Sequence, residues 1–273
     1  AARSLRVLKK LKSLGEGMRA AVASLVVCAT ALQPSVRHAR CDKAFGSSSG
    51  AVEGASVPMD RPLMIGVAGG TASGKTALTE KIVQQLGEAE AVCITMDSFY
   101  RDLTPLELER VEDYNFDVPE AFDFEQCYQV LSALRRGDRG VRIPEYDFVA
   151  NARRPPTCDT VLGEPNIVVF EGILALYDRR LCDLFDVKIF VDADADVRLA
   201  RRIRRDIAAR GRDVDGVLRQ YERFVKPSFD DFCFPTKRNA DVVVPRGAEN
   251  NIAIDLIVHG IRERAGNGSH NRL

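Results

Sequence analysis

The stretch from residue 69 to residue 76, GGTASGKT, decides the fold of this 273-residue chain. It matches G-x-x-x-x-G-K-[ST] in full, the pattern of a phosphate-binding loop. The glycines let the loop wrap closely around a polyphosphate, and the helix that follows presents its positive N-terminus. An apolar run at 63–68 precedes the loop, and a helical pattern at 76–86 follows it. We therefore expect a strand, loop and helix that bind ATP phosphates through Gly69, Gly70, Thr71, Ala72, Ser73, Gly74, Lys75, Thr76 and Ala77.

The rest of the chain alternates between short apolar runs and helical patterns. The apolar runs are 63–68, 91–96, 167–170, 187–191 and 242–244, and the helical patterns are 76–86, 124–135, 195–209, 214–224 and 251–264. Such an alternation predicts a five-stranded parallel sheet covered by helices on both faces, which is a three-layer α/β/α fold. Segment 137–160 alternates only loosely and contains Pro155-Pro156, so we expect a small hairpin insertion there.

The formal net charge is zero, from 39 basic and 39 acidic residues, but the charge is unevenly divided. Residues 1–60 contain nine bases and four acids, a net of +5, so the remaining residues carry −5. An acidic body argues against a nucleic-acid binder, so we expect no nucleic-acid partner. The seven cysteines lack CxxC spacing, which disfavours a disulfide framework or a zinc site and indicates a reduced intracellular protein.

Residues 1–60 differ from the rest and are expected to form an extension. Their apolar run at 20–32 is too short to span a bilayer, which takes about 20 residues, so we expect no membrane partner. Three interpretations remain open: a solvated extension without a specific role, a transit-type presequence, or a secretory signal. We expect a catalytic domain at 61–265, a C-terminal tail at 266–273, and a cytoplasmic location, or an organelle if residues 1–60 direct the chain there.

Two acids follow predicted strands and suit a kinase that acts on a small molecule. Asp97 follows the strand at 91–96, so it faces the ligand crevice and could accept a proton from an acceptor hydroxyl. Glu171 ends the strand at 167–170 and could hold Mg²⁺ through a water molecule. The alternatives are a loop cap for Asp97 and a surface ion pair for Glu171. A regulatory GTPase is excluded because no N-K-x-D occurs, and the D-x-x-G match at 213–216 lies in a helical pattern.

Within the acidic body, the fifteen-residue segment 198–212 contains seven arginines. They predict a lid that closes over the phosphates, because the arginine side chain binds phosphate oxygens with two parallel hydrogen bonds. The alternative is a solvated helix face whose charge is offset by nearby aspartates. The arginines are Arg198, Arg201, Arg202, Arg204, Arg205, Arg210 and Arg212.

Ten motifs in order carry a specific resemblance. They are GGTASGKT, DSFYR, YNFDVPEAFD, IPEYDF, FEGILALY, DADADVRLARRIRRDI, GRD, QY, FVKPSFDDFCFPTK and ADVVVPRGAEN. From about residue 61 to 261 the chain strongly resembles the uridine-cytidine kinases of the P-loop kinase superfamily. The resemblance implies that ATP phosphorylates the 5′-hydroxyl of uridine or cytidine in pyrimidine salvage. The alternatives are a related kinase of another acceptor, such as a phosphoribulokinase or pantothenate kinase, and a catalytically silent nucleotide-binding regulator.

The resemblance also implies residue roles, motif by motif. Asp97 matches the general base, and Lys75, Arg205 and Arg210 match groups that contact the phosphates. Thr76 and Glu171 match the Mg²⁺ site, and Glu249 matches an acid beside the adenine of ATP. The expected nucleoside-binding residues are Tyr100, Phe116, Asp117, Tyr146, Arg202, Arg212 and Gln220.

One position departs from the family pattern. Asn151 stands where a histidine usually reads the pyrimidine edge, so we expect kinase activity to persist with a changed preference or affinity for the base. The family also implies a homotetramer and feedback inhibition by UTP or CTP. Because the sequence given ends soon after its last helical pattern, we expect no phosphoribosyltransferase-like domain, which some relatives carry.

Overall fold

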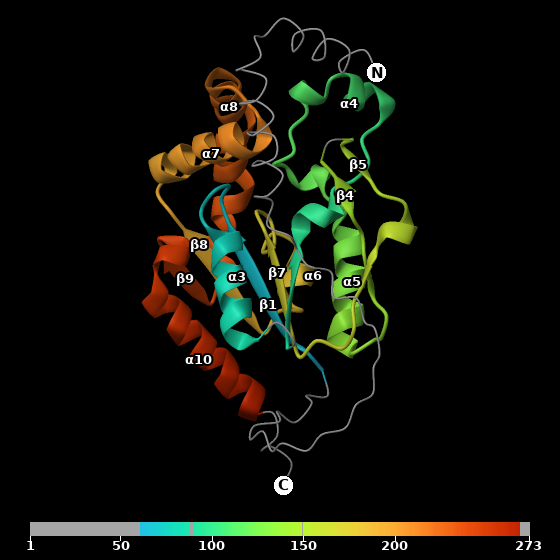
Figure 1. Cartoon of the computed structure of the whole chain (residues 1–273), viewed down its shortest axis with the longest axis vertical. Coiled ribbons are helices and arrows are strands. Elements are labelled where there is room, and N and C mark those ends of the chain that lie inside the picture. Colours follow the sequence, from blue (N-terminus) through green and yellow to red (C-terminus); the bar gives the residue numbers. More distant parts are fainter. Residues whose placement is uncertain (1–60, 88–89, 149, 268–273) are drawn as a thin grey trace, which may run out of the picture. The chain divides into compact units, whose positions relative to one another are not determined.

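The computed structural model describes residues 61–87, 90–148 and 150–267, and a five-stranded parallel sheet forms its centre (Figure 1). The strand order is β2-β7-β1-β8-β9, and every neighbouring pair is parallel. The bounds are β1 (Leu63–Gly69), β2 (Ala91–Thr95), β7 (Ile167–Gly172), β8 (Val187–Asp192) and β9 (Val242–Pro245). The prediction of a five-stranded α/β fold is confirmed.

Helices cover both faces of this sheet, because both faces of its central strands are apolar. In β1, Leu63, Ile65 and Val67 pack on one face against α3 (Lys75–Leu86) and α10 (Asn251–Asn267). Met64 and Ala68 point to the opposite face, which α5 (Phe124–Arg136) and α6 (Arg179–Cys182) cover. Figure 1 shows α3 and α10 on one side of the sheet and α5 on the other. All seven residues of β1 are buried, which anchors the loop that follows it.

The insertion forms two small antiparallel pairs. Strand β3 (Arg142–Ile143) pairs with β6 (Thr160–Val161), and β4 (Tyr146–Asp147) pairs with β5 (Ala152–Arg153). The β4–β5 pair lies beside the 3₁₀ turn Met96–Phe99 that follows the edge strand β2, and the Arg153 side chain donates a hydrogen bond to the Tyr100 carbonyl at 2.8 Å. A short helix that the sequence did not predict, α4 (Pro105–Glu109), starts with Thr104 and Glu107 in a reciprocal capping box.

A helical arm follows β8 and carries the arginines. Helix α7 (Ala195–Arg210) ends at Gly211, whose φ of 63° is the left-handed conformation that glycine adopts easily. Helix α8 (Val214–Gln220) continues into wider π-helical turns at 221–225 and 229–233, with α9 (Lys226–Ser228) between them. The expected helix at 214–224 therefore changes its winding at 221. Pro227 lacks the N–H that an α-helical bond to residue 223 requires.

Within the described residues, no helix is long and apolar enough to cross a membrane. Sequence expectations about residues 1–60 and 268–273 lie outside the described residues.

Candidate active site

The phosphate-binding loop lies between β1 and α3, as the sequence predicted. Gly74 occupies the N-cap of α3 with a φ of 95°, and no side chain caps the N–H groups of the first turn. Gly70 leaves no room for a side chain, because a Cβ there would lie 2.7 Å from Arg198 Nη1 and 2.8 Å from the Phe229 ring. The loop therefore presents backbone N–H groups at a helix N-terminus, which is an anion-binding arrangement.

Glu171 is buried at the end of β7, beside the first turn of α3. The Thr76 hydroxyl donates to Glu171 Oε1 at 3.1 Å, and Oε2 is buried without a hydrogen-bond partner. Burial raises the pKa of Glu171, and the nearby Lys75 ammonium opposes that effect. The surface ion-pair alternative is wrong, because the residue is only 5% exposed. A hydroxyl and an incompletely satisfied carboxylate are oxygen donors that suit Mg²⁺ and its bound water.

Asp97 lies one residue into the 3₁₀ turn after β2. The side chain that caps this turn is Thr95, whose hydroxyl accepts a hydrogen bond from the Asp97 N–H at 3.3 Å. Thr95, and not Asp97, is thus the capping residue of this turn. The Asp97 charge contributes to raising the pKa of Tyr100, of Asp117 and of Glu171, after the burial of each group. Asp97 also lies between Thr95, which is in register with Glu171 in the sheet, and Tyr100 on the expected acceptor side.

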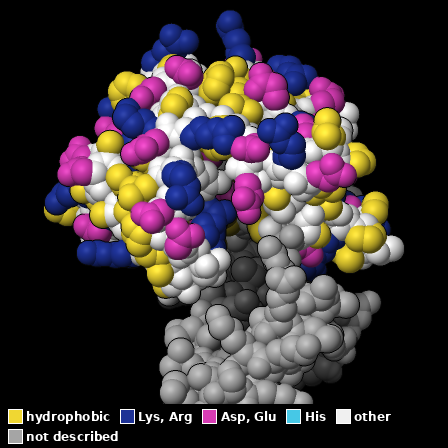
Figure 2. Space-filling model, turned by 90° about the horizontal axis from the view of Figure 1, so that it is seen from above, with side chains coloured by type: hydrophobic (Ala, Val, Ile, Leu, Met, Phe, Trp, Pro, Cys, Tyr) yellow, Lys and Arg dark blue, Asp and Glu magenta, His cyan; other side chains and the backbone are white. Residues whose placement is uncertain are grey.

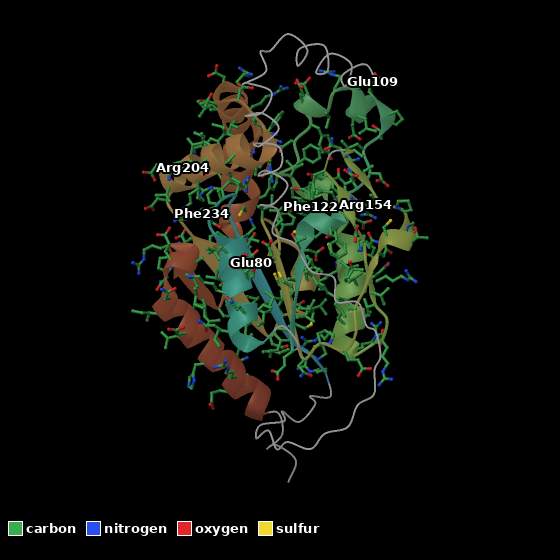
Figure 3. All side chains as sticks on the ribbon, viewed as in Figure 1. Glu80, Glu109, Phe122, Arg154, Arg204 and Phe234 are labelled. Carbon is green, nitrogen blue, oxygen red and sulfur yellow. The ribbon has the colours of Figure 1, made fainter. Side chains whose placement is uncertain are left out.

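Aromatic rings gather next to Asp97. Tyr100 stacks on Phe122 with ring centroids 4.4 Å apart, and it meets the rings of Phe116 and Tyr146 at 5.6 and 5.3 Å. Phe122 lies on the same side of the sheet as α5 (Figure 3). The Tyr146 hydroxyl is buried without a hydrogen-bond partner. Three of the expected nucleoside-binding residues thus form one aromatic cluster with an available hydroxyl.

Asp117 and Asn151 lie on separate loops. The Asn115 side chain accepts a hydrogen bond from the Asp117 N–H at 3.0 Å and donates to the Ser228 hydroxyl at 2.9 Å, which ties the Asp117 loop to α9. Burial raises the pKa of Asp117, and Arg202 opposes that effect most strongly. Asn151 precedes β5 with a φ of 52°, a left-handed conformation in which asparagine is enriched.

Two arginines of the expected lid lie beneath the phosphate-binding loop. Arg202 is 5% exposed and donates to the Thr71 hydroxyl at 3.0 Å and to Gln220 Oε1 at 2.9 Å. Arg198 is also buried, with its guanidinium 3.8 Å from the Phe229 ring centre. The solvated-face alternative is wrong for this part of α7, although Arg204 is exposed (Figure 3).

The other arginines lie toward the end of α7. Arg205, Arg210 and Arg212 are 39–46% exposed in their side chains, and each forms an ion pair with Asp206. Arg212 also donates to Gln220 Oε1 at 2.7 Å. Viewed from the end that carries α4, α7 and α8, basic and acidic side chains are intermixed on the surface (Figure 2).

Three residues of this site have partners that the sequence did not indicate. Arg201 forms an ion pair with Glu249 at 2.5 Å and lies close to Gly74. It therefore connects Glu249, the residue expected beside the adenine, to the phosphate-binding loop. Arg153 holds the Tyr100 carbonyl, and Asp206 pairs with several arginines at once. No spacing in the sequence indicates these partners, because the contacts join distant segments or depend on the direction of one helical face.

Comparisons with known proteins agree with this architecture. The model of the phosphoribulokinase / uridine kinase family matches residues 64–253. A chloroplastic uridine/cytidine kinase of Arabidopsis thaliana is 50% identical over 81% of this chain and 45% of its own length. Uridine-cytidine kinase B of Dictyostelium discoideum is 49% identical over 74% of this chain and 82% of its own length. The chain thus spans less than half the length of the Arabidopsis relative.

Solved structures share the fold at lower identity. Phosphoribulokinase from Rhodobacter spheroides superposes with a TM-score of 0.52 at 18% identity, over 68% of this chain and 70% of that one. D-glycerate 3-kinase from Cryptococcus neoformans gives 0.50 at 18% identity, over 80% and 89%. These likenesses concern the fold alone. From its phosphate-binding loop, its parallel sheet and the family match over most of its length, this chain belongs to the phosphoribulokinase / uridine kinase family.

Proposed function

We propose that this protein transfers the γ-phosphoryl group of ATP to the 5′-hydroxyl of uridine or cytidine. The observation that carries the proposal is the position of Asp97. It lies in the 3₁₀ turn between Thr95, which is in register with Glu171 in the sheet, and Tyr100 of the aromatic cluster. A phosphoryl donor and a planar, hydroxyl-bearing acceptor would therefore meet at this carboxylate.

The donor phosphates would bind the loop and the arginines. Backbone N–H groups before α3 and the Lys75 ammonium would hold the β- and γ-phosphates. Arg205 and Arg210 are partly exposed at the end of α7, so they can exchange part of their pairing with Asp206 for phosphate oxygens. Glu249 and Arg201 would lie beside the adenine. Phosphoryl transfer depends mainly on such positioning and charge stabilisation.

Asp97 would act as the general base. It would accept the proton of the 5′-hydroxyl as that oxygen bonds to the γ-phosphorus, and the bond from this phosphorus to the β–γ bridging oxygen would break to release ADP. Tyr100, Phe116 and Tyr146 would enclose the pyrimidine, with Asn151 at its edge. Asp117, Arg202, Arg212 and Gln220 would contact the sugar and the base.

Thr76 and Glu171 fit a Mg²⁺ site. The Thr76 hydroxyl would bind the ion directly, and Glu171 Oε2, which has no hydrogen-bond partner, would hold one of its water molecules. No group of three or more acidic, histidine or cysteine side chains suited to a metal gathers in 61–87, 90–148 or 150–267, so the phosphates would supply further ligands. When bound, Mg²⁺ neutralises charge on the β- and γ-phosphate oxygens.

A coupled assay with MgATP and a panel of acceptors tests the proposal. We expect ADP release with uridine and cytidine and none with ribulose 5-phosphate or pantothenate. Turnover with ribulose 5-phosphate alone would assign the other branch of the family. ATP binding without turnover on any acceptor would favour a regulatory protein.

Regulation, assembly and location are parts of the same proposal. We propose that UTP or CTP inhibits the enzyme and that it assembles as a homotetramer, which inhibition kinetics and sedimentation would test. One relative carries the word chloroplastic in its name, which supports the transit-type interpretation of residues 1–60. Imaging of a fluorescent fusion with and without these residues would distinguish an organelle from the cytoplasm.

A further inference from the structure

Asp206 is a fully buried acid in the last half of α7, and four arginines surround it. Arg205 and Arg210 approach Oδ1 at 2.9 and 3.5 Å, and Arg212 and Arg202 approach Oδ2 at 3.2 and 3.7 Å. Burial alone would raise the pKa of this carboxyl, but the arginines outweigh burial and lower it. Asp206 is therefore ionised at neutral pH and forms the centre of the cluster.

The cluster connects two parts of the site. One end of the Arg202 guanidinium donates to the Thr71 hydroxyl in the phosphate-binding loop, and the other end donates to Gln220 at the end of α8. Arg212 donates to the same Gln220 oxygen and also to Asp206. A continuous chain of polar contacts thus runs from the loop through Arg202 to α8, and Asp206 faces two of its members.

Electrostatics explain why Asp206 matters to this chain of contacts. Four guanidinium groups that converge without an acid repel one another, whereas one buried carboxylate lets them stay together. The Nε of Arg202 has no hydrogen-bond partner, so its 3.7 Å ion pair with Asp206 is the interaction that faces this side of the guanidinium. Removing the charge would release Arg202 and Arg212 from the geometry in which both meet Gln220.

We propose that Asp206 is a positioning residue that couples the ATP site to the acceptor site. It orients Arg202 and Arg212 so that occupation of the phosphate-binding loop orders α8 and Gln220 for the acceptor. The identity of the two ligands rests on the proposed function, whereas the coupling rests on the contacts among these residues.

The first test measures the coupling directly in the full chain. The dissociation constant of uridine is measured by calorimetry with and without a non-hydrolysable ATP analogue, and the ratio of the two values is the coupling factor. We expect Asp206→Asn, which keeps the size of the side chain, to reduce this factor about fivefold or more. Asp196→Asn is the matched control, because it makes the same change at an exposed position on the same helix and should keep the wild-type factor. An unchanged factor in Asp206→Asn, or none in the wild type, overturns the proposal.

The second test does not depend on the acceptor. Hydrogen exchange of residues 211–220 is measured with and without ADP. We expect ADP to slow exchange there in the wild type and in Asp196→Asn but not in Asp206→Asn. Equal slowing in all three proteins overturns the coupling.

A further variant keeps the proposal testable if Asp206→Asn does not fold. Thr71→Val removes the hydroxyl that Arg202 contacts and leaves Asp206 in place, so it should also weaken the slowing by ADP; full slowing in this variant counts against the proposal. If ADP slows exchange but uridine does not bind, the coupling stands and the proposed acceptor is wrong. If uridine is phosphorylated while the variants keep the wild-type coupling, the function stands and the role of Asp206 is wrong.

Discussion

Substituting Gly172 by alanine should reduce turnover by displacing Asp97. Gly172 ends β7, directly after Glu171, and packs against Met96, which precedes Asp97. A Cβ at position 172 would lie 2.3 Å from the Met96 Cβ, whereas ordinary contact begins at 3.4 Å, so these atoms must separate by 1.1 Å (3.4 − 2.3). Because the Met96 Cβ is bonded directly to the backbone, a change of rotamer cannot relieve the clash. The backbone at 96–97 must move instead.

The size of this displacement determines the expected changes in kcat and in stability. A misplacement of about 1 Å can cost about 10²-fold in rate, and we expect that loss in kcat. Overpacking a buried site costs about 1–3 kcal/mol. For a domain of this size each kcal/mol lowers Tm by about 2–4 °C, so Tm should fall by several degrees while the protein remains folded at 25 °C.

The assay compares kcat, Tm and the affinity for an ATP analogue in the wild type and two variants. Gly163→Ala is the matched control, because a Cβ at position 163 meets no atom within 4 Å. It should leave all three quantities near their wild-type values. A folded Gly172→Ala protein whose kcat stays within about threefold of wild type would refute the reasoning that Met96 transmits the clash to Asp97.

Three further predictions concern single side chains. Asp97→Asn should lower kcat by about 10²-fold or more with little change in the dissociation constant of an ATP analogue, since the amide cannot accept the proton; near-normal kcat would remove Asp97 from the role of base. Asn151→His should change kcat/KM for uridine relative to cytidine, and equal values before and after the substitution would contradict the assignment of Asn151 to the base edge. Burial raises the pKa of Cys233 to about 12, so at pH 8 almost none of it is thiolate. Alkylation followed by peptide mass spectrometry should therefore label the exposed Cys158 and leave Cys233 unlabelled until denaturant is added, and labelling of Cys233 in the native protein would argue against its burial.

The main architecture could be predicted from the sequence because its signals are local. Apolar runs such as 63–68 place strands, and the glycines of 69–74 with Lys75 and Thr76 place the phosphate-binding loop between a strand and a helix. The helical pattern at 195–209 agrees with α7, which ends before Gly211. The D-x-x-G match at 213–216 was correctly set aside, since the Asp213 carboxylate caps α8 by accepting the Gly216 N–H at 2.8 Å.

Other features could not be predicted because they depend on contacts between distant segments. The short helix α4 is an exception, because its capping box of Thr104 and Glu107 is a local signal, whereas the π-helical turns after Gln220 have no clear sequence signal. The pairing of Arg201 with Glu249 spans 48 residues of sequence, and that of Arg202 with Thr71 spans 131. Periodicity predicts which residues share a helical face, but it does not say what that face meets.

The sequence by itself determined the sheet, the phosphate-binding loop and the chemical type of the site residues, since backbone propensity and motif spacing are properties of neighbouring residues. Only the tertiary structure decided which arginines are buried and which remain open to solvent. It placed Arg198 and Arg202 beneath the loop, left Arg204 exposed, paired Arg201 with Glu249, and gathered Arg205, Arg210 and Arg212 around Asp206. The physical reason is that the free energy of a charge depends on its burial and its partners, and the fold sets both.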